Sequence, residues 1–332
     1  MDARPVRRGV HGRHNGAVLD ADAMLTSARR PLVVGIGGGG DVVGALALAE
    51  PLRRLHGARP VVGGMTWERM PVDAHPGPRR LEEIAGAVEQ LGPDAVLAGA
   101  DTRVLESGVR FGEARVAELM GEETVLVDPS GGPHAVADAL AAAIARRGAD
   151  LLVLLDVGGD ALAHGDEAGL ASPLCDAVVL AGGAQLAARG VPVLGAVFGP
   201  ACDGELEVDE VMARVAEIAA GGGVAGARWL TGSAAALLER AVACIPTEAS
   251  AQPLRAFRGQ VGTTTIRGGR RGVEISPLGA LTVFFDVPVA LDTAARLARA
   301  VRSARTLEEA NDILHGLGVR TELDFERAAL EV

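Results

Sequence analysis

The amino-acid sequence predicts an α/β fold with a doubly wound, mostly parallel sheet of the Rossmann-like type and a smaller C-terminal α+β portion. Short apolar, β-branched runs alternate with Ala-rich stretches of helical length. The apolar runs are nearly continuous, which is typical of parallel strands covered by helices on both faces. Because crossovers between parallel strands are right-handed, a doubly wound sheet is the simplest topology for these units.

Most of the alternation lies within the first 222 residues. We expect strands at residues 31–35, 60–64, 95–98, 124–128, 149–156 and 191–198. We expect helices at residues 42–55, 79–91, 112–120, 133–147, 174–188 and 206–220. These elements define a predicted ligand-binding domain over residues 31–222. Residues 1–30 are predicted to be a flexible leader, because their basic residues precede no apolar run of a signal peptide.

The pattern changes after three consecutive glycines at residues 221–223. We therefore expect an α+β portion over residues 223–332, packed on the first domain. Its elements would be a helix at 233–243, a hairpin or small meander over 263–285, helices at 291–302 and 306–317, and a last strand at 320–325.

Composition narrows the classes of function. The formal net charge is −11 and the arginines are dispersed, so no basic stripe is available for nucleic acid. The apolar runs are too short to span a membrane. The three cysteines form no CxxC motif, which favours a reducing compartment and hence the cytoplasm. We also expect a homo-oligomer.

The chain contains no Lys and no Tyr, so all 32 residues counted as Lys or Arg are arginines. A P-loop needs a Lys to reach the nucleotide phosphates, and a Schiff-base enzyme needs a Lys nucleophile. Walker-type nucleotidases, pyridoxal-phosphate enzymes, class I aldolases and Tyr-Lys dehydrogenases are therefore excluded.

A glycine-rich turn follows the first predicted strand. Its residues are Gly35, Ile36, Gly37, Gly38, Gly39, Gly40 and Asp41. Glycines permit a tight turn, and the N-terminus of the next helix favours a phosphate or carboxylate. Gly37–Gly40 and Asp41 are therefore predicted to bind a cofactor, although a ligand-free turn has the same pattern. Asp41 would cap the helix, or bind a ribose hydroxyl or a metal, and its charge disfavours a bare pyrophosphate.

Three candidate residues follow the second predicted strand. Glu68 lies near the place where an acidic residue contacts ribose in dinucleotide-binding folds, so we predict a cofactor-binding role for it. Trp67 and Arg69 are candidates for substrate binding. The alternative is an ordinary loop with Trp67 anchored in the core.

Acidic residues also follow the fifth and sixth predicted strands. Paired carboxylates beside flexible backbone suit a hard cation or a sugar diol, and they can divide acid and base roles. We predict catalytic and metal-binding roles for Asp156, Asp160 and Asp203. Candidate substrate-binding residues are Gly158, Gly159, Glu167, Asp176 and Glu205. The alternative for several of these acids is helix capping.

The predicted topology brings these loops together, because ligands in open α/β sheets bind at the carboxyl edge of the strands. In the C-terminal portion, Arg267, Arg270 and Arg271 form a cluster that suits an anionic substrate. The alternative is a solvated hairpin tip.

Several of these segments together resemble the family catalogued as domain of unknown function 1152, first described from archaeal hypothetical proteins. The matching stretches are GIGGGGDVVGA, GGMTWERMPVD with the later PGPR, DVGGDALAHGDE, SPLCDA, FGPACDGEL and, weakly, LTVFFD, over roughly residues 30–290. The resemblance implies that the matched residues belong to one site, and it implies no particular activity.

The residues predict an enzyme that acts on a phosphorylated or nucleotide-like small metabolite, with Mg²⁺ as cofactor. A transferase, a lyase or a hydrolase fits equally. The ligand would be anionic or polyhydroxylated, with a nucleotide as one option, and neither nucleic acid nor a membrane would be a partner. Two alternatives remain: an NAD(P)- or flavin-dependent oxidoreductase, and a non-catalytic nucleotide-sensing subunit.

Overall fold

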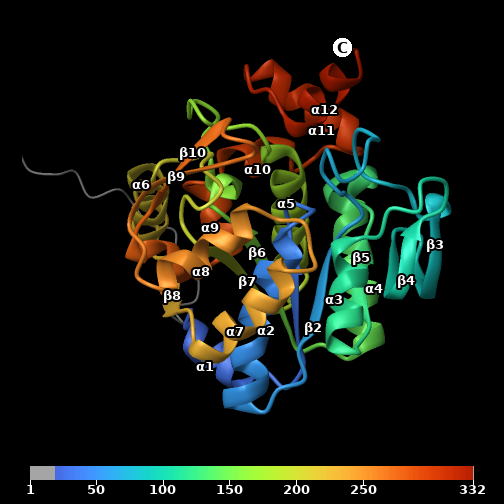
Figure 1. The fold of residues 1–332 in the computed structure, drawn as a ribbon, viewed down its shortest axis with the longest axis horizontal. Helices are drawn as coiled ribbons and strands as arrows, with labels where there is room; N and C mark the ends of the chain where they lie inside the picture. The colour runs from blue at the N-terminus through green and yellow to red at the C-terminus, as the bar shows by residue number, and fades with distance from the viewer. Residues whose placement is uncertain (1–18, 332) are drawn as a thin grey trace, which may run out of the picture.

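The computed structural model describes residues 19–331, and Figure 1 shows a central sheet with helices around it. Among these residues, nine strands form one sheet in the order β3-β4-β5-β2-β1-β6-β7-β11-β8. Their bounds are β1 Pro31–Gly35, β2 Val61–Met65, β3 Ile84–Gly92, β4 Ala95–Val104, β5 Thr124–Val127, β6 Leu151–Val157, β7 Val193–Phe198, β8 Val224–Trp229 and β11 Leu281–Phe285.

The centre of the sheet is parallel and its two flanks are antiparallel. β1 pairs in parallel with β2 and β6, β2 with β5, and β6 with β7. β4 runs antiparallel to β5, and β11 antiparallel to β7. The predicted α/β fold with a mostly parallel sheet is confirmed. Because the chain leaves β1 for β2 and returns for β6, the strand order reverses between β1 and β6.

Helices cover both faces, so β1 sends alternate side chains into two cores. Leu32 and Val34 belong to one core and Val33 to the other. The first core holds helices α4 Gly132–Arg147, α5 Pro173–Ala188, α6 Val208–Ala220, α9 Val287–Asp292, α10 Arg296–Val301 and α11 Leu307–Gly316. The second holds α1 Ala21–Ser27, α2 Asp41–His56, α3 Gly112–Met120, α7 Gly232–Val242 and α8 Gln252–Phe257.

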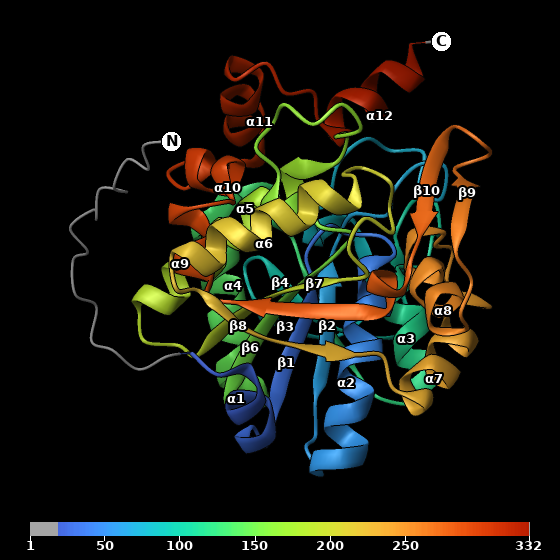
Figure 2. The ribbon, with the colours of Figure 1, turned by 90° about the vertical axis from the view of Figure 1, so that its left-hand side faces the viewer.

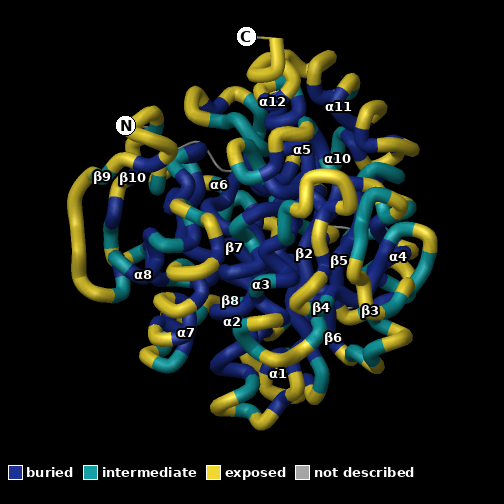
Figure 3. Tube along the Cα trace, turned by 45° about the vertical axis from the view of Figure 1, so that its right-hand side comes forward, coloured by how far each residue is buried: buried dark blue, intermediate teal, exposed yellow. Residues whose placement is uncertain are grey.

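The helix predicted at residues 79–91 is wrong. A single 3₁₀ turn at Leu81–Glu83 leads into strand β3, which pairs antiparallel with β4. Gly86 has φ +73°, which a continuous helix cannot accommodate. Pro93 and Asp94 form the turn between the two strands. Much of β3 is exposed at the edge of the sheet, as Figure 3 shows, so cross-strand pairing overrides the helical pattern of its sequence.

The chain after residue 222 is part of the main sheet. β8 and β11 extend that sheet beyond β7, because the side chains of Val283, Phe284 and Phe285 are buried in it. Only β9 Gly262–Ile266 and β10 Arg271–Ile275 form a separate hairpin, which stands above α8 in Figure 2. The predicted meander over residues 263–285 is therefore wrong in its last strand.

Two further differences concern the ends of the described chain. The strand predicted at residues 320–325 is wrong, because α12 occupies Glu322–Leu330 with Thr321 and Asp324 in a capping box. At the other end, α1 places Ala21 and Leu25 in the core, within the predicted leader. The leader's first 18 residues lie outside the described residues. No helix over residues 19–331 combines the length and the apolar character that a membrane crossing requires.

Candidate acidic site at the carboxyl edge of the sheet

The loops after β1 and β6 meet where the strand order reverses, which is where open α/β sheets bind ligands. The loop after β1 turns tightly into α2. A Cβ on Gly35 would lie 2.4 Å from the backbone carbonyl carbon of Asp41, so only glycine allows the helix to approach this closely. Asp41 then stands at the start of α2, and its Oδ2 accepts a hydrogen bond from Gly37 N at 2.9 Å.

Asp41, Asp156 and Asp176 form the first carboxylate group. One ligand atom from each lies within 4.8 Å of the others. Asp156 is the penultimate residue of the buried strand β6, and its Oδ2 accepts a hydrogen bond from Ala161 N at 3.1 Å. Asp176 lies in the first turn of α5, is 1% exposed, and its Oδ1 is buried without a hydrogen-bond partner among the described residues.

Asp160, Asp203 and Glu205 form the second carboxylate group, again with ligand atoms within 4.8 Å of one another. Glu205 Oε2 accepts hydrogen bonds from the backbone N–H groups of Ala171 and Ser172, at 2.7 Å each. A Cβ on Gly158 would lie 2.3 Å from Asp203 Cγ, so a glycine is needed for this loop to pass the carboxylate.

The carboxyl groups resist ionisation. Burial is the largest cause that raises the pKa of Asp41 and that of Asp203 to about 7. Burial also raises the pKa values of Asp156, Asp160 and Asp176 well above their usual range, and repulsion between the two groups adds to it, as when Asp176 acts on Asp160. The second group therefore lies within electrostatic reach of the first.

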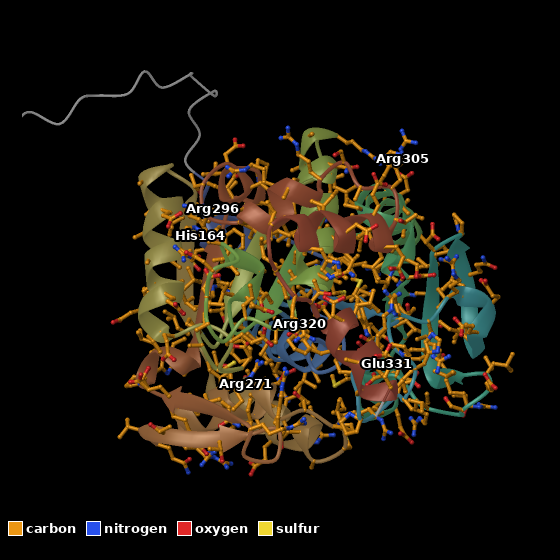
Figure 4. All side chains as sticks on the ribbon, turned by 90° about the horizontal axis from the view of Figure 1, so that it is seen from above. His164, Arg271, Arg296, Arg305, Arg320 and Glu331 are labelled. Carbon is orange, nitrogen blue, oxygen red and sulfur yellow. The ribbon has the colours of Figure 1, made fainter. Side chains whose placement is uncertain are left out.

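Glu205 is the exception. Burial alone would raise its pKa, but the guanidinium groups of Arg271 and Arg267 outweigh burial and lower it. Arg271 Nη1 lies 2.6 Å from Glu205 Oε1. Figure 4 looks down on the molecule from above and labels Arg271 on its hairpin.

The arrangement suits hard cations. Mg²⁺ and Ca²⁺ prefer carboxylate oxygens, and a cation would relieve the repulsion that raises these pKa values. The predicted metal ligands are divided between the two groups, with Asp156 in the first and Asp160 and Asp203 in the second. Gly159, with φ +120°, begins the turn that carries Asp160.

Other predicted site residues lie outside the two carboxylate groups. Trp67 is fully buried, and its Nε1 donates to Glu326 Oε2 at 3.0 Å. Glu68 Oε1 accepts from Gly112 N at 2.5 Å. Glu167 accepts from His164 N and Gly165 N and pairs with Arg214 at 2.9 Å. These carboxylates already have protein partners.

The glycine turn is held from several sides. Gly39 N donates to Trp67 O at 2.8 Å. A Cβ on Gly38 would lie 2.7 Å from Trp67 O, and one on Gly40 would lie 2.2 Å from Thr247 Oγ1. Arg69 donates to Gly37 O and pairs with Glu322 Oε1 at 3.1 Å. Arg69 thus supports the turn that carries Asp41.

Sequence reasoning missed two glutamates on α12 that contact this region. Glu322 accepts hydrogen bonds from Leu174 N at 3.0 Å and from Cys175 N at 2.9 Å, at the start of the helix that carries Asp176. Glu326 Oε2 accepts from Trp67 Nε1 and from Gly77 N at 2.9 Å. The signal that could have found them is the capping box at Thr321 and Asp324, which predicts a helix and not a strand.

A further buried acid, Glu113 on α3, is 1% exposed, and both its oxygens lack hydrogen-bond partners among the described residues. Burial, followed by repulsion from Glu68, raises its pKa well above the usual range. A carboxyl group whose pKa is higher in the folded than in the unfolded state stabilises the fold while protonated. This stability is lost as the pH rises through the folded-state pKa.

We therefore expect Glu113→Met to raise the free energy of unfolding by about 1–3 kcal/mol at pH 8, and by less at pH 5. Urea unfolding at both pH values measures the difference. Glu118→Met on the same helix is the matched control, because Glu118 is 61% exposed and, within residues 19–331, pairs only with Arg110. An equal change in the free energy of unfolding at both pH values would contradict the prediction.

A separate cavity of about 270 Å³ opens between α2 and the β8–β11 edge, lined by residues that include Leu48, Phe198 and Trp229. Its lining contains no acidic side chain. This cavity therefore lies apart from the two carboxylate groups that form the candidate site.

The fold and the site together define an α/β protein with a mostly parallel sheet and an acidic cluster where the strand order reverses. A family model described as "Protein of unknown function (DUF1152)" matches residues 32–330, and the chain therefore belongs to this family. No curated protein and no solved structure matches the chain.

Proposed function

We propose that the protein is a divalent-cation-dependent enzyme that acts on a phosphorylated or nucleotide-like small molecule at the carboxyl edge of the sheet. One observation carries this proposal: two neighbouring groups of three acidic side chains, with ligand atoms within 4.8 Å in each group. Carboxylates buried this closely are costly unless a cation or protons compensate them.

Mg²⁺ is the cation that we propose. Asp41, Asp156 and Asp176 would hold one ion, and Asp160, Asp203 and Glu205 would hold a second. Bound there, such ions would supply charge neutralisation for phosphate oxygens during attack and departure of the leaving group. The described chain orients the carboxylates through backbone donors, such as Ala161 N for Asp156 and Ala171 N for Glu205.

Two contacts favour this proposal over dinucleotide binding. Asp41 already accepts from the N–H of Gly37, and its carboxylate faces the turn that a pyrophosphate would approach. Glu68 accepts from Gly112 N inside the core, so we assign it a structural role and not ribose binding. We therefore propose that the cations and the arginines near Glu205, and not the glycine turn, would bind the phosphate.

We expect Mg²⁺ or Mn²⁺ to raise the melting temperature of chelator-treated protein. A ligand at one hundred times its dissociation constant stabilises by about 2.7 kcal/mol, which corresponds to a rise of about 4 °C for a chain of this size. Thermal unfolding across a cation titration measures it, with calorimetry for the stoichiometry. Na⁺ at matched ionic strength is the control. A melting temperature that no divalent cation changes at millimolar concentration would remove the basis of the proposal.

A further inference from the structure

The β9–β10 hairpin packs directly on the second carboxylate group. A Cβ on Gly204 would lie 2.4 Å from Gly272 O, so the hairpin backbone and the loop after β7 are in close contact. Arg271 fixes this contact, because its Nη1 pairs with Glu205 Oε1 at 2.6 Å and donates to Asp203 O at 3.4 Å. The hairpin tip therefore stands beside Asp203 and Glu205.

Arg267 also contacts the second carboxylate group, but much of its side chain remains exposed. Its Nη2 lies 3.5 Å from Glu205 Oε1, and its side chain is 44% exposed. That oxygen already accepts from Arg271 and from Ser172 Oγ, which donates at 2.5 Å. Arg271 therefore balances the charge of Glu205. The guanidinium of Arg267, with five N–H donors, keeps most of its hydrogen-bonding capacity for another partner.

The backbone of Arg267 is also unusual, with φ +53°, a conformation that glycine or asparagine adopts more readily. Two glycines follow at residues 268 and 269, and the backbone N–H of Arg267 donates to Glu248. A non-glycine residue in this conformation costs about 1–3 kcal/mol, and such strain is concentrated at ligand-binding sites.

We propose that Arg267 binds the phosphate-type anion of the substrate, and that this anion binds after the divalent cations. This inference rests on the proposed function, because the anion would bridge the cations and the guanidinium. The two groups contain six acidic side chains, and the guanidinium groups of Arg69, Arg267 and Arg271 lie near them. Without divalent cations, the anion would lack the ions that it bridges, so we expect the cations to bind first. Arginine suits the task because its planar donors match phosphate oxygens in pairs.

The probe is inorganic pyrophosphate, added to the full chain with and without excess Mg²⁺ and followed by thermal shift and calorimetry. In the wild type, pyrophosphate is expected to raise the melting temperature beyond Mg²⁺ alone, and to leave the chelator-treated protein unchanged. Arg267→Asn removes the guanidinium while keeping a residue that tolerates positive φ. It is expected to weaken pyrophosphate binding about 10–100-fold and Mg²⁺ binding by less than about twofold.

Arg270→Asn is the matched control on the same hairpin, because Arg270 is exposed and its Nε donates only to Arg267 O at 3.0 Å among its described contacts. Arg267→Lys should recover part of the lost affinity. Equal pyrophosphate affinity in the Arg267→Asn and Arg270→Asn variants would overturn this inference, as would a wild type that binds no pyrophosphate or binds it equally well without Mg²⁺. A wild type that binds no Mg²⁺ would instead overturn the proposed function.

Discussion

The Asp156→Asn variant is expected to lose cation binding while its ion-free form becomes more stable than the wild type. Asn can still accept from Ala161 N, as Asp156 does at 3.1 Å. The substitution removes a carboxyl group whose ionisation is opposed by burial and by the neighbouring Asp41 and Asp203. We expect cation affinity to fall at least about 100-fold, with the free energy of unfolding about 1–3 kcal/mol higher without cations.

Asp101→Asn is the control for Asp156→Asn, because Asp101 is exposed on β4 and belongs to neither carboxylate group. Both variants would be compared with the wild type by urea unfolding in chelator and by thermal shift in Mg²⁺. Opposite signs in the two media identify a binding carboxylate, since binding sites commonly sacrifice stability. An Asp156→Asn variant that keeps a full Mg²⁺ response would exclude Asp156 as a ligand.

The second large effect is expected for Glu322→Ala. Glu322 is 5% exposed, pairs with Arg69 at 3.1 Å and accepts from the first N–H groups of α5. Its removal leaves the guanidinium of Arg69, whose side chain is 23% exposed, without this carboxylate, so we expect a loss of about 3–5 kcal/mol in the free energy of unfolding. Mg²⁺ affinity should fall as well, because α5 positions Asp176.

Glu308→Ala provides the comparison for Glu322→Ala. Glu308 pairs with Arg327 on the same pair of C-terminal helices, but both side chains are about half exposed. An exposed pair contributes about 0–1 kcal/mol. Chemical unfolding of both variants checks the contrast, and similar losses for the two would mean that burial of the Arg69–Glu322 pair does not set its energetic contribution.

The parallel centre of the sheet could be predicted because its strands are buried on both faces and read as apolar runs. The place of the acids followed from the same fact: residues at the carboxyl ends of neighbouring parallel strands share one edge. The structure does bring Asp41, Asp156 and Asp176 together, and Asp160, Asp203 and Glu205. Their roles as ligands or catalysts stay predictions.

The remaining features depend on contacts that local patterns do not encode. β3 is an edge strand whose sequence has a pattern typical of a helix. Its extended structure depends on antiparallel pairing with β4. β11 lies between β7 and β8 in the sheet, although β8 and the β9–β10 hairpin lie between β7 and β11 in the sequence. Glu322 and Glu326 became visible only with the fold, because their partners Arg69 and Trp67 lie 253 and 259 residues earlier.

Those separations bear on how the chain matures during synthesis. The turn containing Asp41 emerges from the ribosome early, but Trp67 and Arg69, which hold it, receive their glutamate partners only when α12 is made. Pairings over such distances form slowly because a long loop must close first. Until then, Arg69 and the start of α5 lack the contacts that Glu322 of α12 provides. The proposed cation affinity would therefore be acquired late, and it would report that α12 has docked.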